Sequence, residues 1–191
     1  MKIIKSRILK ILIVTLFIGF LLGIISFLMI KNKNIKFNYI NYIDLINNGN
    51  FNYTNSLIKS IFYNLRYSFF IWIFGILFIF SFMSLFLIAF KGISLGFMIT
   101  SIIWTFKIKG VLYALILSLN SIINITIFLL LSYYSINFSI KSLNAYRNNR
   151  QINYKSFFIN YIYIYVILSF SLILSSLFEI YICSNIIKFV V

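Results

Sequence analysis

Long uninterrupted apolar runs constrain this chain more than any other feature. Residues 11–30, 67–90, 111–134 and 157–183 form four such runs with almost no charge inside them. An α-helix of about 20 residues, rising 1.5 Å per residue, crosses a hydrocarbon core about 30 Å thick. With 62% hydrophobic and only 10% charged residues, the chain has too few polar side chains to cover a soluble domain. The sequence therefore predicts an all-α, polytopic membrane helix bundle.

A further apolar run at residues 92–106 is shorter than the others. It follows Lys91, where the pattern is broken by Lys91-Gly92, and it is closed by Lys107. Its apolar part gives only roughly 21 Å of helix. We expect either a span with snorkelling flanking lysines or a half-membrane segment. The whole chain, residues 1–191, then forms a single membrane domain of about five transmembrane helices.

The only long polar stretch lies at residues 31–66, between the first two predicted spans. It is rich in asparagine and contains Asn48-Gly49-Asn50, a turn signal. We expect an exposed loop, with a short interfacial helix near Leu57–Arg66.

The basic residues around the first apolar run predict the orientation of the chain. The first run is longer than the apolar part of a typical signal peptide, and Lys31-Asn32-Lys33-Asn34 follows it in place of a small-residue cleavage site, so we expect an uncleaved anchor. Positive charge favours the cytoplasmic side. The cluster before the first run therefore places the N-terminus inside and residues 31–66 outside; its members are Lys2, Lys5, Arg7 and Lys10.

The charged residues argue against a nucleic-acid or catalytic role. The net charge of +15 comes from Lys and Arg spread between apolar runs, where helix ends meet lipid headgroups, so we expect membrane lipids and no nucleic acid as partners. The chain has no His and a single Cys, which excludes a His-based triad and a zinc site built from these residues. Its two acids, Asp44 and Glu179, form a catalytic pair only if they meet in the fold. We expect a protein that is not an enzyme, with no metal and no cofactor.

Two pairs of glycines four residues apart are candidate helix-packing sites. Gly19 and Gly23 lie in the first apolar run, and Gly92 and Gly96 lie at the start of the short one. Glycines at this spacing share one helix face and allow a neighbouring backbone to approach closely. The pairs indicate packing within the chain or, alternatively, binding to a partner or to a second copy in a homo-oligomer.

Three polar side chains inside the last two runs are further candidates. Asn120 and Asn124 share one helix face, which is expected to face other helices or a wet cavity because an unpaired amide in hydrocarbon is costly. Interhelical hydrogen bonding and a path for a solute remain the two alternatives. Glu179, near the end of the last run, is by default a functional-site candidate. The structural alternative for Glu179 is an ion pair with one of three cations: Arg66, Lys91 or Lys188.

Three segments of the chain resemble the stage II sporulation protein M family. They are Phe90-Lys91-Gly92-Ile93-Ser94-Leu95-Gly96, then Lys109-Gly110-Val111-Leu112, then Ser176-Leu177-Phe178-Glu179-Ile180-Tyr181. The family has a KGxxxG turn, a KG before the next span and an LIEAY sequence near its C-terminus. The order and spacing fit this pattern, and Tyr181 joins the candidate residues through it. Ser184 stands where the family usually has a proline.

The resemblance implies a membrane scaffold of the sporulation septum in an endospore-forming bacterium. Such a scaffold is thought to hold two cell-wall hydrolases, stage II sporulation proteins D and P, during septal peptidoglycan thinning and engulfment. We expect Gly92→Leu or Glu179→Ala to abolish retention of these partners without unfolding the protein. The alternative is a small transport component, such as a vitamin-transporter membrane subunit or a permease-like protein, which has a similar size and number of spans.

Overall fold

The described part of the computed structural model is all-α, as the sequence predicts. It comprises residues 2–30, 38–49, 51–147 and 154–190, and no strand occurs within them. Lys31–Asn34 and Asn50, which belong to the predicted loop, lie outside these residues. The elements are α1 (Lys2–Ile30), α2 (Asn38–Asn47), α3 (Tyr53–Ile76), the 3₁₀ helix η1 (Phe78–Phe82), α4 (Met83–Arg147), α5 (Tyr154–Leu177), the π-helix η2 (Phe178–Cys183) and α6 (Ser184–Val190).

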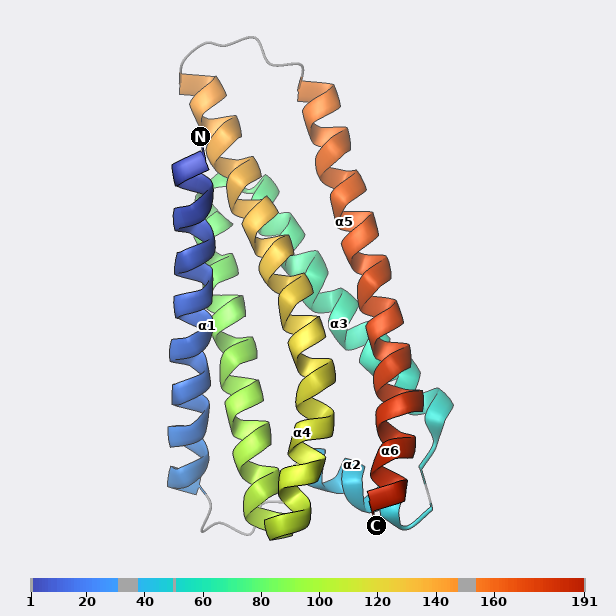
Figure 1. Ribbon diagram of the computed structural model, residues 1–191. Coiled ribbons are helices and arrows are strands. Elements are labelled where there is room, and N and C mark those ends of the chain that lie inside the picture. Colours follow the sequence, from blue (N-terminus) through green and yellow to red (C-terminus); the bar gives the residue numbers. More distant parts are fainter. Residues whose placement is uncertain (1, 31–37, 50, 148–153, 191) are drawn as a thin grey trace.

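The long helices lie side by side as a bundle (Figure 1). α4 is bent back on itself at Lys107, which has non-helical backbone angles (φ 51°, ψ −121°) and divides it into limbs at 83–106 and 108–147. α1, α3, the two limbs of α4 and α5 run along the bundle. The N-terminus lies at one end of the bundle, whereas α2, α6 and the bend at Lys107 lie at the other. Residues 38–47 are therefore folded as a helix at the same end as the C-terminus.

The break between the second and third long helices is not at Lys91-Gly92, where we expected it. α3 ends at Ile76, and the chain turns through η1 before α4 begins at Met83. The turn is held by hydroxyls, because the carbonyl of Phe78 accepts hydrogen bonds from Ser81 Oγ (3.0 Å) and from Ser139 Oγ of the second α4 limb (3.0 Å). The first α4 limb, residues 83–106, is consequently about 36 Å long and not the short segment we expected.

The predicted interfacial helix at Leu57–Arg66 is the first half of α3. Asn52 caps this helix by accepting a hydrogen bond from the backbone N–H of Asn55 at 3.3 Å. The helix then continues without interruption to Ile76. The second predicted span, residues 67–90, is therefore divided between the end of α3, η1 and the start of α4.

All four glycines of the two GxxxG pairs lie between α1 and α4. A Cβ atom on Gly19 would meet the backbone of Ala89, and one on Gly23 would meet the backbone of Ile93. Cβ atoms on Gly92 and Gly96 would meet the α1 backbone in turn, closer than real Cβ atoms approach. Since Gly19 pairs with residue 89 and Gly23 with residue 93, the two helices run parallel. The glycines thus allow α1 and the first α4 limb to pack backbone to backbone.

Three described helical segments are long and apolar enough to cross a membrane. They are Arg7–Ile30, Phe80–Arg147 and Lys155–Lys188, and the second of them contains the bend at Lys107. α3 is not among them, because Lys59, Asn64 and Arg66 reduce its hydropathy. The protein is therefore a membrane helix bundle, while the number of about five spans stays a prediction.

Candidate functional site

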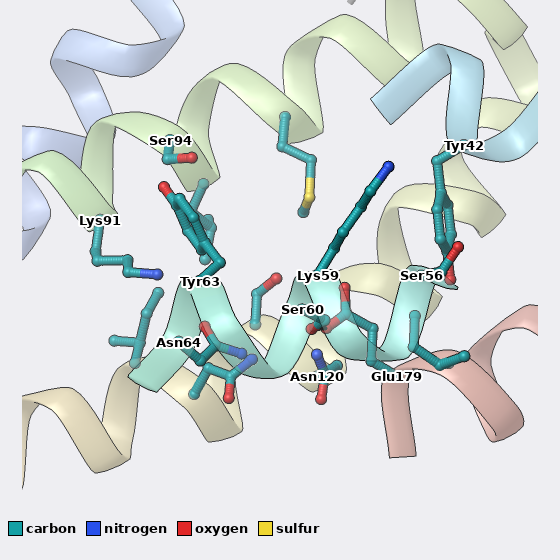
Figure 2. A pocket seen from close by; sticks show the side chains of 16 residues that line it. Tyr42, Ser56, Lys59, Ser60, Tyr63, Asn64, Lys91, Ser94, Asn120 and Glu179 are labelled. Atoms are coloured by element: carbon teal, nitrogen blue, oxygen red, sulfur yellow. Dashed lines mark hydrogen bonds between the residues drawn. The ribbon is translucent and has the colours of Figure 1, made fainter. Parts of the chain in front are cut away.

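A polar cavity of about 440 Å³ lies inside the apolar bundle (Figure 2). In Figure 2, Lys91 lies towards one end of the cavity, Tyr42 and Ser56 lie towards the other, and Ser60 and Glu179 lie between them. Helices α2, α3, α4 and η2 all contribute to the walls. The lining residues are Tyr42, Ser56, Lys59, Ser60, Tyr63, Asn64, Lys91, Ser94, Leu95, Met98, Asn120, Ser121, Asn124, Ile125, Glu179 and Ile180.

One wall is a polar stripe on α3. Ser56, Ser60 and Asn64 are spaced four residues apart, so they lie on one face of the helix. Ser60 Oγ donates a hydrogen bond to Glu179 Oε2 at 3.1 Å, and Asn64 Nδ2 donates one to Ser176 Oγ at 3.1 Å. These bonds join α3 to the end of α5 and to η2 in a region where unpaired polar groups would be costly.

Asn120 and Asn124 form part of the opposite wall, on the second α4 limb. Ser175 Oγ of α5 lies 3.0 Å from Asn120 Oδ1 and 2.7 Å from Asn124 Oδ1. The Asn120 side chain is almost fully buried, at 2% exposure, and also hydrogen-bonds Glu179. The asparagine face therefore makes interhelical hydrogen bonds and also lines the cavity, while a path for a solute stays a prediction.

Glu179 enters the cavity from a distorted turn. It belongs to η2, where the helix adopts the wider π form before continuing as α6. Single π turns inside α-helices occur frequently at functional sites. Ile180 and Cys183 of the same turn are buried, whereas Tyr181 is exposed.

Lys91 is partly buried and lies in a cage of three aromatic rings, of which Phe128 is buried and Tyr63 is exposed. Its Nζ lies 4.7, 4.4 and 4.5 Å from the ring centroids of Tyr63, Tyr67 and Phe128. The next residue, Gly92, packs against the backbone of Leu16, inside the apolar run of α1. Ring faces attract an ammonium group, more strongly where it is desolvated. The three rings explain how a lysine is accommodated inside an apolar, continuous helix.

The three cations considered as ion-pair partners of Glu179 all contact aromatic rings. Arg66 lies over Phe70 at 5.9 Å, and Lys188 lies over Tyr53 at 5.1 Å. Lys91 shares the cavity with Glu179 and interacts with it electrostatically across that space. The hydrogen bond that reaches Glu179 Oε2 comes from a hydroxyl, Ser60.

At the end of the cavity near the C-terminus, α2 and α6 are joined to the start of α3. Tyr42 OH and Ser184 Oγ lie 2.8 Å apart, and Tyr53 OH donates a hydrogen bond to Asn185 Oδ1 at 3.2 Å. Burial raises the pKa of Tyr42 well above its ordinary value, although the hydrogen bond with Ser184 acts in the opposite direction. We call this assembly of α2, the start of α3, η2 and α6 the C-terminal platform. Tyr181 belongs to it and stacks on Tyr53, with the ring centroids 5.9 Å apart.

The candidates from the sequence thus fall into two groups, apart from Tyr181, which lies on the platform. Lys91, Asn120, Asn124 and Glu179 line the cavity, and the four glycines pack α1 against α4. The α3 stripe and the aromatic cage are not among the residues predicted from the sequence. The spacing of Ser56, Ser60 and Asn64 indicates one polar helix face, but the asparagine-rich sequence around it favours a loop with an interfacial helix. No local pattern marks the cage, because its rings come from two helices.

Comparison with known proteins identifies the chain at the level of a family. The family model described as stage II sporulation protein M matches residues 11–184. This match runs from within α1 to the first residue of α6, and hence covers both the glycine interface and the cavity. No curated protein and no solved structure matches the chain. The chain belongs to the stage II sporulation protein M family, and it is a sporulation-related membrane protein.

Proposed function

We propose that the protein is a membrane scaffold in endospore formation. In this role it holds cell-wall hydrolases at the sporulation septum for peptidoglycan thinning and engulfment. The proposed partners are stage II sporulation proteins D and P, as the family resemblance implies. Family membership supports a role in sporulation, and the helix bundle supports a location in the cell membrane.

The observation that carries the scaffold proposal is the C-terminal platform. With the N-terminus inside, the platform faces the cell wall, where the hydrolases act. It is an ordered surface rather than a loose loop, because hydrogen bonds tie α2 and the start of α3 to α6. A side chain on an ordered surface binds a partner with a smaller loss of conformational entropy. Asp44 and Leu45 are exposed on α2 and provide contact points.

The positions of the two acidic residues, Asp44 and Glu179, agree with a protein that binds partners and does not itself catalyse a reaction. Asp44 is exposed on the platform, whereas Glu179 lines the cavity and bonds to Ser60 and Asn120. Two carboxyl groups that act together on one substrate need to flank the same bond. Asp44 does not line the cavity, so the two acids are not arranged as a pair around it.

The experiment is a pull-down from detergent extracts of sporulating cells. Leu45→Glu places a charge on the platform and should reduce retention of stage II sporulation proteins D and P by about tenfold or more. Leu143→Glu is the matched control, because both leucines are 46% exposed. Leu143 belongs to the last turns of α4, and α4 ends at the other end of the bundle. Equal loss in both variants, or no loss in either, would contradict docking on the platform.

The polar cavity favours a second candidate function, a small transport component. A space of about 440 Å³ with convergent polar groups falls within the size range of small-molecule sites. Purified protein that retains a vitamin through gel filtration would favour this function over the scaffold. Such a subunit would also require an energy-coupling partner.

A further inference from the structure

The polar cavity carries more positive than negative charge. Two lysines, Lys59 and Lys91, and one acid, Glu179, line it. In their charged forms these groups give the cavity lining one net positive charge: Lys91 and Glu179 lie within the apolar bundle, and Lys59 is exposed at its surface. Charge in such surroundings is costly unless a counter-charge accompanies it. The cavity is therefore suited to an occupant with a single negative charge.

The Lys91 ammonium can donate hydrogen bonds to that occupant. An ammonium group has three N–H donors. The rings of Tyr63, Tyr67 and Phe128 attract its charge without neutralising it. The carboxylate of Glu179 already accepts hydrogen bonds from Ser60 and Asn120. An anion in the cavity would complete the surroundings of the Lys91 ammonium.

The lining of the cavity indicates an amphiphile. Leu95, Met98, Ile125 and Ile180 supply apolar wall beside the polar groups. An occupant that fills both parts needs a polar head and an apolar tail. Basic pockets between transmembrane helices are known to bind lipid headgroups.

We propose that the polar cavity binds the phosphodiester headgroup of an anionic lipid, with Lys59 and Lys91 facing the phosphate and Glu179 facing hydroxyl groups of the head. A phosphodiester carries one negative charge and so balances the cavity, whereas inorganic phosphate carries more. Phosphatidylglycerol has this charge and has head hydroxyls that can donate to a carboxylate. The inference does not depend on the scaffold role, because the platform contacts proposed for the hydrolases lie on α2 and not in the cavity.

The test is native mass spectrometry of the full chain in neutral detergent. The protein is incubated with equal amounts of phosphatidylglycerol, phosphatidylethanolamine and phosphatidylcholine, and bound lipid is counted. Phosphatidylglycerol should be retained preferentially, and Lys59→Gln and Lys91→Gln should each reduce that retention by about fivefold. Lys141→Gln is the matched control, since Lys141 also lies over a ring, Phe157 at 5.7 Å, but outside the cavity.

The outcomes separate the lipid from other occupants. Lys59 is exposed, so its replacement leaves the fold intact and keeps the test valid even if Lys91→Gln does not fold. Equal retention of the three lipids, or equal loss in Lys141→Gln, would overturn the proposal. A second arm measures the melting temperature with inorganic phosphate alone. Stabilisation by phosphate that depends on Lys59, without any lipid bound, would also overturn it, and so would co-purification of a water-soluble vitamin.

Discussion

Lys91 and Glu179 line one cavity, although Lys91 comes from the first limb of α4 and Glu179 comes from the π-helix η2. Each is held by a different kind of neighbour. The lysine lies among three aromatic rings, whereas the glutamate accepts a hydrogen bond from Ser60. Two of the segments that carry the family resemblance therefore meet around the same space. These two segments, which lie far apart in the sequence, together form part of a polar site within a membrane bundle.

We predict that Gly92→Leu destabilises the protein. A side chain at this position would meet the α1 backbone, so the two helices must separate, which costs about 1–3 kcal/mol or more. This corrects the sequence-based expectation that Gly92→Leu would spare the fold. Thermal unfolding in detergent measures the effect, and Thr126→Leu, on an exposed position of α4, is the control. An unchanged melting temperature for Gly92→Leu would show that α1 and α4 do not pack as described.

The aromatic cage predicts an energetic coupling between Lys91 and Phe128. A double-mutant cycle with Lys91→Met and Phe128→Leu should give a coupling of about 0.5–2 kcal/mol, the range for cation–π contacts. The free energy of unfolding in a denaturing detergent titration provides the measurement. Additive effects of the two substitutions would indicate that the ammonium does not lie on the ring.

Glu179→Ala and Glu179→Gln should behave differently. Alanine removes the acceptor of the Ser60 hydrogen bond and leaves buried polar groups unpaired, at a cost of about 1–3 kcal/mol. Glutamine keeps an acceptor oxygen and should retain most of the stability. The melting temperatures of the two variants, with Ser60→Ala for comparison, test this. If Glu179→Gln lost as much as Glu179→Ala, the charge rather than the hydrogen bond would be responsible.

Tyr42→Phe should loosen α2 from α6 without unfolding the bundle. The change removes the Tyr42–Ser184 hydrogen bond, worth about 0.5–1.5 kcal/mol. Hydrogen–deuterium exchange of α2 amides should accelerate, while that of α1 stays the same. Because burial raises the pKa of Tyr42, its contribution to stability is complete below about pH 10 and is lost only as pH rises through the higher folded-state pKa. Equal exchange in both proteins at neutral pH would contradict the platform contact.

The predicted orientation can be tested with single cysteines. In a Cys183→Ser background, Asp44→Cys on α2 and Tyr146→Cys near the end of α4 place one exposed thiol at each end of the bundle. A membrane-impermeant maleimide should label Asp44→Cys in intact cells and Tyr146→Cys only after permeabilisation. The reverse pattern would place the platform inside and would contradict the proposed docking of hydrolases.

The sequence predicted the helix class and the polar face of Asn120 and Asn124, because hydropathy and helical spacing are local signals. The break at 77–82 could not be predicted, since it lies within an apolar stretch that contains no charged residue and no proline. Lys91-Gly92, in contrast, carries signals of a break although the helix continues through it. A lysine within an apolar run predicts the end of a helix. The rings that accommodate Lys91 come from α3 and the second α4 limb, so the sequence around Lys91 does not indicate them.

The proposed scaffold role requires that cell-wall hydrolases bind to the C-terminal platform of this protein. The most direct measurement is the amount of stage II sporulation proteins D and P that co-purifies with it from sporulating cells. We expect both to be retained by the wild type and by Leu143→Glu, and to be lost from Leu45→Glu. Absence of both hydrolases from the wild-type preparation, with the protein intact in the membrane fraction, would contradict the account.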